Sequence, residues 1–224
     1  MLLYIIRHGE TRLNKEGKLQ GRVDEPLNES GRELAVITGE ALKDVPFDLV
    51  ITSPLSRAKE TGILAVRASA LKQGKEIPVI DDDRLMEFSW GSWDGEGCAP
   101  ENYSIPTGLD NYNLFFTDPF RFQNAPDGET FQDLIERLGD FYQDLIHNPE
   151  YQDKTILIST HGCATRALLN PLYDDPTDFW QGDVPMNCAV NIVEVRDGVS
   201  RFLKKDIIFY DESLCNNRYT AIKE

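Results

Sequence analysis

Apolar and polar residues alternate along this chain in blocks that predict strands and helices in turn. Short apolar runs bounded by polar turns are typical of buried strands. They occupy residues 2–6, 47–52, 77–80, 155–160, 188–195 and 201–209. Helical spacing and helix-start signals place helices at residues 34–42, 54–70, 129–146 and from 162 onward. Strands that alternate with helices predict an α/β fold, a three-layer sandwich around a mostly parallel central sheet.

Residues 97–128 interrupt this alternation. They show little periodicity and contain four prolines and many aromatic residues. A long irregular stretch inside a compact domain is commonly functional or partly helical, so we interpret it as an insertion that folds over the main body. Its aromatic side chains either form a lid that contacts a bound small molecule or fill a satellite core.

The length of 224 residues favours a single domain, 1–224. The pair Asp197-Gly198 between the last two apolar runs predicts a hairpin turn. Residues 210–224 are polar, and we expect this tail to be loosely held.

The charge balance excludes two classes of partner. The chain has 23 Lys and Arg residues against 38 Asp and Glu residues, a net charge of −15 at pH 7. Such a protein repels polyphosphate backbones and anionic lipid surfaces, so we expect neither nucleic acid nor a membrane as partner. A local exception is a cationic segment at residues 7–22, which we expect to steer an anionic small molecule. Its basic residues are Arg7, Arg12, Lys15, Lys18 and Arg22, against Glu10 and Glu16.

Cysteine and histidine usage suggests neither a metal site nor a disulfide framework. The four cysteines are far apart in sequence and form no C-x-x-C pair, and there are three histidines. We therefore expect no metal and no cofactor. The apolar run at residues 2–6 is too short for a secretory signal, and no apolar run approaches membrane-spanning length. A cytoplasmic location is the expectation.

Charged side chains follow several of the predicted strands. Arg7 and His8 follow the first strand, Arg57 follows the second, and His161 follows the strand at 155–160. Glu87 lies in a loop rich in aromatic residues and glycine. Because parallel strands bring their carboxyl ends to one edge of the sheet, these side chains can meet there. Two guanidinium groups suit a phosphate, a neutral histidine can act as nucleophile, and a carboxylic acid can protonate a leaving oxygen.

Four motifs make this arrangement specific. They are R-H-G-E-T at 7–11, S-P-L-S-R-A-K-E-T at 53–61, L-M-E-F-S-W-G-S-W-D-G at 85–95 and T-H-G at 160–162. In kind, order and approximate spacing they resemble the histidine phosphatase superfamily, the phosphoglycerate mutase-like group. The resemblance extends over residues 2 to about 195.

The resemblance implies a role for each of these residues. His8 attacks the substrate phosphorus and forms a phosphohistidine that water then hydrolyses. Arg7, Arg57 and His161 hold the transferring phosphoryl group, and Glu87 protonates the leaving oxygen. Fixed cationic donors can stabilise such a transfer without a metal.

Four further residues are expected to contact the substrate. Asn14 occupies the asparagine of an R-H-G-E-T-x-x-N pattern and would add a neutral donor. Gln20, Gly21 and Gly162 are the other three residues expected to bind the substrate. The amides that follow Gly162 open a helix, whose positive dipole end favours an anion.

The segment after Glu87 favours the phosphatase branch of this family. There a G-x-W-E-G pattern is usual, and this chain has G-S-W-D-G with Asp94 in place of the glutamate. We therefore expect a metal-independent phosphatase of the histidine acid type that hydrolyses a small phosphomonoester. The alternatives are a phosphoglycerate mutase and a catalytically weak regulatory binding module of the same fold. The sequence indicates neither the particular substrate nor the oligomeric state.

Cys163 follows His161 by two residues at a predicted helix N-terminus. This position can favour a thiolate, which predicts modest sensitivity to oxidation. The alternative is a buried, inert cysteine.

Overall fold

The computed structural model describes residues 1–215 and 219–222. Within these residues a six-stranded sheet has the order β3-β2-β4-β1-β5-β6. The strands are β1 Leu2–Arg7, β2 Leu49–Thr52, β3 Val79–Asp81, β4 Thr155–Thr160, β5 Val190–Arg196 and β6 Val199–Ile207. Neighbours among β3, β2, β4 and β1 pair in parallel, β5 pairs antiparallel with β1, and β6 pairs antiparallel with β5. The predicted α/β fold with a mostly parallel sheet is confirmed.

Strand β1 lies between β4 and β5, and its side chains reach both faces of the sheet. Leu3 and Ile5 belong to the apolar core on one face, whereas Tyr4 and Ile6 belong to the core on the other. Both faces are covered, which explains why the strand appears in sequence as an unbroken apolar run rather than as an alternating one.

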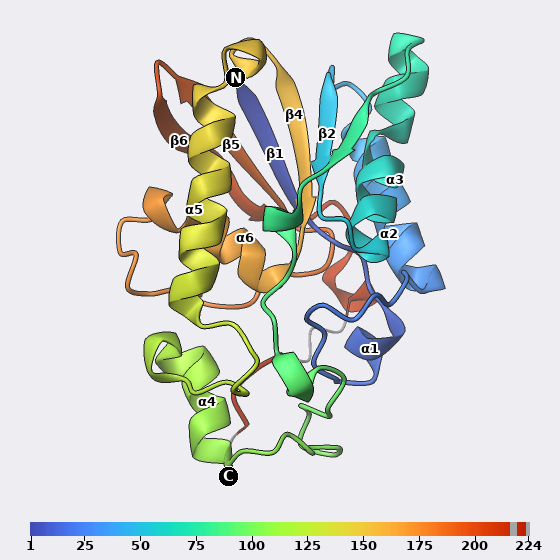
Figure 1. The fold of residues 1–224 in the computed structure, drawn as a ribbon. Helices are drawn as coiled ribbons and strands as arrows, with labels where there is room; N and C mark the ends of the chain where they lie inside the picture. Colours follow the sequence, from blue (N-terminus) through green and yellow to red (C-terminus); the bar gives the residue numbers. More distant parts are fainter. Residues whose placement is uncertain (216–218, 223–224) are drawn as a thin grey trace.

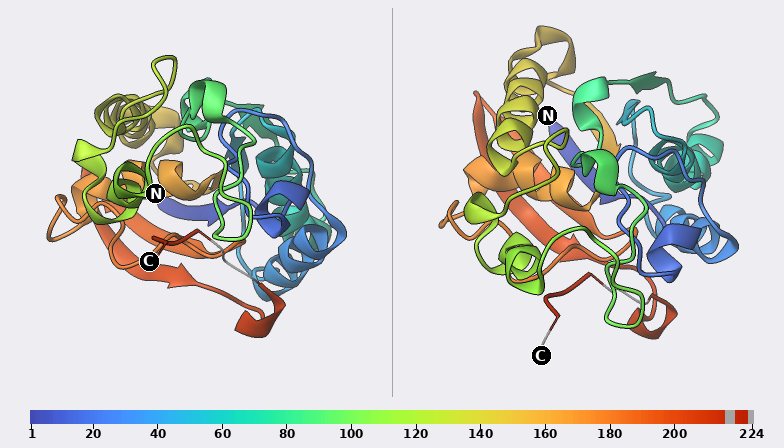
Figure 2. Two further views of the ribbon diagram at one scale, coloured as in Figure 1. Left: turned by 90° about the horizontal axis from the view of Figure 1, so that it is seen from below. Right: turned by 60° about the horizontal axis from the view of Figure 1, so that its bottom comes forward.

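The helices form the outer layers. They are α1 Arg12–Lys15, α2 Glu29–Ala41, α3 Ser56–Gln73, α4 Leu109–Thr117, α5 Phe131–His147 and α6 Gly162–Leu169. Figure 1 shows α5 and α6 on one side of the sheet and α2 and α3 on the other, and Figure 2 gives the same layers from below. Among the helices of the described residues, none is both long enough and apolar enough to cross a membrane.

Local signals in the sequence explain where these elements begin and turn. Asn28 caps α2, because its side chain accepts a hydrogen bond from the Gly31 amide at 2.8 Å. Thr130 and Asp133 form a reciprocal capping box at the start of α5. The β5–β6 hairpin turns at Asp197 and Gly198, which both have positive φ, as a type I′ turn requires.

Residues 97–128 contain α4, and their aromatic side chains are packed rather than free. Tyr112 and Phe115 are buried, and Tyr103 and Phe116 pack against the same core as α5 and α6. The segment lies beyond the carboxyl ends of the parallel strands, at the bottom of Figure 1. Most of these aromatic residues therefore fill a core, as the second of the two interpretations expects.

Residues 219–222, near the end of the chain, form hydrogen bonds to the main body. Asn113 of α4 donates to the Ile222 carbonyl at 2.9 Å and accepts from the Ile222 amide at 2.8 Å. The Tyr219 hydroxyl accepts from Asn14 at 2.9 Å. Residues 219–222 are therefore bonded to the main body, which the predicted loosely held tail does not include; residues 216–218 and 223–224 lie outside the described part of the chain.

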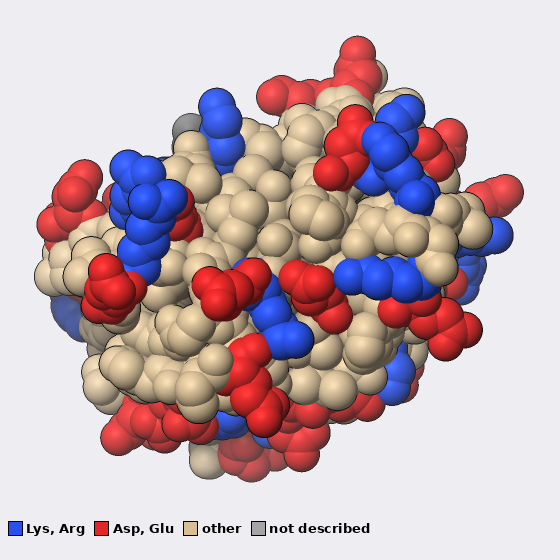
Figure 3. Space-filling model, turned by 90° about the horizontal axis from the view of Figure 1, so that it is seen from above, with Lys and Arg blue, Asp and Glu red and all other residues tan. Residues whose placement is uncertain are grey.

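Seen from above, the end of the molecule at the amino ends of the parallel strands carries interspersed acidic and basic side chains (Figure 3). Ion pairs at this end include Lys75 with Asp48, just before β2, at 3.3 Å, and Arg201 with Glu194, opposite the start of β1, at 2.7 Å. Exposed pairs of this kind contribute little to stability.

The core on the α5 side provides a test of the fold. Leu138 of α5 is fully buried, whereas Leu71 of α3 is 75% exposed. We expect Leu138→Ala to lower the free energy of unfolding by about 2–5 kcal/mol through lost transfer and an added cavity. Leu71→Ala is the matched control and is expected to change it by less than about 0.5 kcal/mol. Urea unfolding followed by circular dichroism measures both, and equal effects would contradict this packing.

Candidate active site

The candidate residues lie where parallel strands end. β1 ends at Arg7 and His8 follows it, while β4 ends directly before His161, the N-cap of α6. Arg57 lies in the first turn of α3, which follows β2. These ends face the bottom of Figure 1, so the sheet brings together side chains that are far apart in sequence.

His8 is buried, and its tautomer is fixed by its neighbour. Its Nδ1 lies 2.7 Å from the Gly9 carbonyl oxygen, which can only accept, so Nδ1 carries the hydrogen. The neutral ring therefore has its free lone pair on Nε2. The ring centroid lies 5.1 Å from that of His161, and the Asn187 side chain donates to the His8 carbonyl at 2.9 Å.

Burial and positive neighbours keep both imidazoles neutral. Burial, followed by the guanidinium groups of Arg57 and Arg7, lowers the pKa of His8 well below its ordinary value of 6.5. Burial and then Arg57 lower the pKa of His161 in the same direction. A neutral imidazole is the form that can act as a nucleophile.

The two arginines are held by backbone carbonyls. Arg57 is fully buried and donates to the Val23 carbonyl at 2.8 Å and to the Gly21 carbonyl at 2.7 Å. Burial lowers the pKa of Arg57 to about 10, so the group stays cationic at neutral pH. Arg7 donates through Nη1 to the Pro185 carbonyl. Both guanidinium groups are thus oriented without a carboxylate bonded to them among the described residues.

Buried polar atoms without a hydrogen-bond partner concentrate in this site. Among the described residues, five buried side-chain nitrogen or oxygen atoms have no hydrogen-bond partner. They are Arg7 Nε, Gln20 Nε2, Arg57 Nε, His161 Nδ1 and Thr38 Oγ1. All but Thr38 belong to the predicted site. Buried polar groups are normally paired, so this cluster indicates an absent acceptor.

Asp94 fixes the loop that holds Arg57. Its carboxylate accepts from the amides of Gly21 at 2.7 Å, Arg22 at 2.8 Å and Val23 at 2.8 Å. Gly21 is required for close packing, because a Cβ there would lie 2.5 Å from the Phe88 carbonyl oxygen. Gly21, predicted to contact the substrate, thus supports Arg57 through its backbone and is not among the residues that line the cavity described below.

Glu87 lies across the N-terminus of α6. Its Oε1 accepts from the amides of Phe88 at 2.8 Å and Ala164 at 3.0 Å, and its Oε2 accepts from Cys163 at 3.1 Å. From the sequence we expected the first amides of α6 to favour a bound anion. In the structure two of these amides donate hydrogen bonds to Glu87 instead.

A small cavity of about 40 Å³ joins most of the predicted residues. One water molecule needs about 10–15 Å³ of such volume, so the cavity has room for a group of only a few heavy atoms. Its lining includes Arg7, His8, Asn14, Gln20, Glu87 and Gly162. Arg57 and His161 are not among the residues that line this cavity, but the charge of Arg57 acts on His8 and the His161 ring lies next to the His8 ring.

Other lining residues were not predicted from the sequence. Trp180 and Val184 come from the irregular segment before β5, and Tyr219 comes from the tail. Phe115 is the lining residue from residues 97–128, so that segment contributes to the cavity through α4. No periodicity or motif marks Tyr219, whose hydroxyl donates to the Lys18 carbonyl at 2.7 Å.

The cationic segment at residues 7–22 is largely compensated by neighbouring carboxylates. Arg12 pairs with Glu16 at 3.1 Å and Glu25 at 3.0 Å. Lys18 also pairs with Glu16, at 3.0 Å, and Arg22 lies 3.6 Å from Glu129. Attraction of an anionic small molecule should therefore come mainly from the buried Arg7 and Arg57 rather than from the whole segment.

Cys163 does not favour a thiolate. It is buried, and burial together with the nearby Glu87 raises the pKa of its thiol well above 9.0. Burial and the raised pKa favour the buried, inert alternative over the predicted sensitivity to oxidation. Within residues 1–215 and 219–222, no three His, Cys, Asp or Glu side chains are grouped so as to hold a metal ion.

The lowered histidine pKa values predict a pH-dependent stability. The folded protein keeps His8 and His161 neutral, while the unfolded chain binds protons below pH 6.5. The free energy of unfolding should therefore fall as pH drops below 6.5, by up to about 1.4 kcal/mol per pH unit for each histidine. We expect His8→Gln to make this slope shallower in urea titrations between pH 7.5 and 5.5, measured at about half-unit steps. His147→Gln, at the exposed end of α5, controls for the loss of an imidazole; an unchanged slope in His8→Gln would contradict the prediction.

Comparison with known proteins agrees with the geometry. A family model described as the histidine phosphatase superfamily (branch 1) matches residues 3–207. The protein named uncharacterized phosphatase PhoE from Bacillus subtilis is 30% identical over 188 residues, 84% of this chain and 86% of that protein. The 2,3-bisphosphoglycerate-dependent phosphoglycerate mutase 2 of Gloeobacter violaceus is 34% identical over 175 residues, 76% of this chain and 75% of the mutase.

A solved structure has the same fold. Bacillus stearothermophilus YhfR superposes with a TM-score of 0.79 at 30% sequence identity, and the match covers 93% of this chain and 98% of that one. The family match spans β1 to the end of β6 and includes the four sequence motifs. The chain therefore belongs to the histidine phosphatase superfamily, branch 1.

Proposed function

We propose that this protein is a metal-independent phosphomonoesterase that hydrolyses a small phosphorylated metabolite through a phosphohistidine on His8. The observation that carries the proposal is the group of buried, unpartnered polar atoms on Arg7, Arg57, Gln20 and His161, of which the nitrogens of Arg7, Arg57 and Gln20 are donors. A phosphoryl group supplies the oxygen acceptors and negative charge that these donors lack. The relatives named as phosphatases support the same reaction class.

In the first step His8 Nε2 attacks the phosphorus atom. A P–N bond forms and the bond from phosphorus to the leaving oxygen breaks. The fixed tautomer favours this step, because Nδ1 already donates to the Gly9 carbonyl and leaves the Nε2 lone pair available. Arg7 and Arg57 would stabilise the charge on the transferring oxygens from positions fixed before the substrate binds.

Glu87 would give its proton to the leaving oxygen. Two amides occupy the two lone pairs of Oε1, whereas Oε2 accepts only from Cys163 among the described residues. Oε2 therefore has the lone pair that can carry a proton. Oε2 also faces the cavity side of α6, since it lies 3.5 Å from where a Cβ on Gly162 would be.

In the second step water attacks the phosphohistidine. Glu87, now a carboxylate, takes a proton from that water, the P–N bond breaks and inorganic phosphate leaves. His8 and the protonated Glu87 are regenerated, so one water molecule is consumed for each ester hydrolysed. Arginine side chains supply the positive charge in both steps.

The intermediate gives a direct test. We expect wild-type protein mixed with radiolabelled p-nitrophenyl phosphate and quenched in alkali to retain label in an acid-labile form, because a P–N bond has formed. His8→Ala should retain none and lose at least about 10³-fold in turnover, since the nucleophile is gone. His147→Ala is the matched control, and a chelator should leave wild-type turnover unchanged. Label retained by His8→Ala would refute the assignment.

A phosphoglycerate mutase is the second candidate, because the Gloeobacter violaceus relative carries that name. We expect 3-phosphoglycerate, given with a bisphosphoglycerate primer, to release free phosphate faster than it forms 2-phosphoglycerate. Faster formation of 2-phosphoglycerate would favour the mutase. Binding of phosphomonoesters without any turnover would favour a regulatory module.

A further inference from the structure

Glu87 lies on a segment that has no regular structure to hold it. It falls between two short 3-10 turns, Asp83–Leu85 and Gly91–Trp93. A proton donor must be placed accurately against the leaving oxygen, and small displacements lower its effect strongly. The position of Glu87 must therefore be fixed from outside its own segment.

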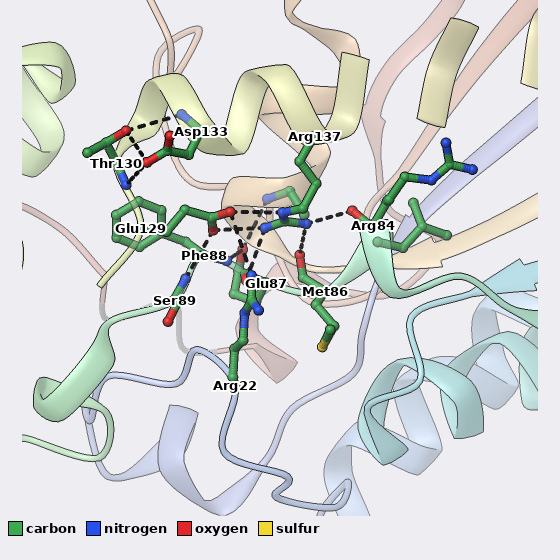
Figure 4. Close-up of polar contacts among 12 residues, drawn as sticks. Arg22, Arg84, Met86, Glu87, Phe88, Ser89, Glu129, Thr130, Asp133 and Arg137 are labelled. Atoms are coloured by element: carbon green, nitrogen blue, oxygen red, sulfur yellow. Dashed lines mark hydrogen bonds and ion pairs between the residues drawn. The ribbon is translucent and has the colours of Figure 1, made fainter. Parts of the chain in front are cut away.

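The Arg137 side chain of α5 hydrogen-bonds to the backbone of this segment (Figure 4). Its Nη1 donates to the carbonyls of Arg84 at 2.6 Å and Met86 at 2.9 Å, and its Nη2 donates to the Glu87 carbonyl at 3.4 Å. Three backbone carbonyls within four residues thus share one rigid, planar group.

The remaining hydrogens of Arg137 bind Glu129. Nε lies 2.8 Å from Glu129 Oε1, and Nη2 lies 2.8 Å from Oε2. All five N–H bonds of the guanidinium are therefore in use. The pair is largely shielded from water, since the side chains of Arg137 and Glu129 are 17% and 9% exposed.

Glu129 binds the same segment on the C-terminal side of Glu87. Its Oε2 accepts from the Ser89 amide at 3.2 Å, and its own amide donates to the Ser89 carbonyl at 2.9 Å. Glu129 directly precedes Thr130, which caps α5, so both Arg137 and Glu129 are anchored on one helix (Figure 4). The backbone is consequently held on both sides of Glu87.

We propose that Arg137, with Glu129, is a positioning residue that holds Glu87 against the leaving oxygen of the substrate. This inference rests on the proposed function, because it takes Glu87 as the proton donor. Arg137 itself touches neither the cavity nor the nucleophile. Its effect is to fix the backbone from which the carboxyl reaches α6 and the cavity.

Leaving-group dependence distinguishes positioning from general structural support. Phenyl phosphate and p-nitrophenyl phosphate have similar shapes, but the nitrophenolate is the more stable leaving group and needs less help from an acid. The ratio kcat/KM reports the first phosphoryl transfer, whichever step limits kcat. We expect Arg137→Lys to lower kcat/KM at least about 10-fold on phenyl phosphate and less than about 3-fold on p-nitrophenyl phosphate.

Three further variants make the result decisive. Glu87→Gln should show the same selective loss to a larger degree. Arg84→Lys is the matched control, because the Arg84 side chain binds Asp82 and Asp144 and does not reach the Glu87 carboxyl or its backbone. It should affect the two esters equally. Glu129→Gln, which keeps one acceptor oxygen for Arg137, should repeat the selective loss if Arg137→Lys does not fold.

Each alternative outcome identifies what has failed. Equal losses on both esters in Arg137→Lys, or no loss, would overturn the positioning role when Glu87→Gln still discriminates between them. A Glu87→Gln variant that does not discriminate would overturn the role of Glu87. A wild-type protein that hydrolyses neither ester would overturn the proposed function itself.

Discussion

The site depends on one electrostatic constraint, the burial of two guanidinium groups at the carboxyl edge of the sheet. Removing a charge from water is costly unless fixed dipoles replace the lost hydration. Backbone carbonyls do so only in part, because Nε of Arg7 and Nε of Arg57 have no partner among the described residues. Burial, and then the same positive charges, lower the pKa values of His8 and His161. One arrangement thus favours a bound anion and places beside it the neutral imidazole that we propose as nucleophile.

The nearby carboxylates of Glu87 and Asp94 bind backbone amides and form no direct ion pair with these guanidinium groups. Glu87 accepts from Phe88 and from the first amides of α6, and Asp94 accepts from the amides of residues 21–23. Arg57 then binds two carbonyls of the same loop that Asp94 holds by its amides. Each carboxylate therefore fixes a loop while leaving a guanidinium available, which a direct ion pair would prevent.

Much of this arrangement could be predicted from sequence, for identifiable physical reasons. β1 and β4 are buried on both faces, so their apolar runs and the polar residues after them mark the sheet edge, and motifs located His8 and His161 there. The sequence could not show that Gly21 supports Arg57 through its backbone, since any residue offers the same amide and carbonyl. Nor could it place Tyr219, whose contact with Asn14 spans 205 positions and follows no pattern.

Glu87 can bind the amides at the start of α6 and also serve as the proposed proton donor, because its two carboxyl oxygens have different hydrogen-bond partners. A helix N-terminus favours an acceptor with negative charge, so a proton on this carboxyl must weaken one of its bonds to amides. The bond at risk is that from Cys163 to Oε2, whereas Oε1 keeps both of its donors when Oε2 is protonated. The side chain can therefore gain and lose a proton without leaving α6. With its backbone bonded to Arg137, the carboxyl can stay in one place through both halves of the proposed reaction, which needs it first as acid and then as base.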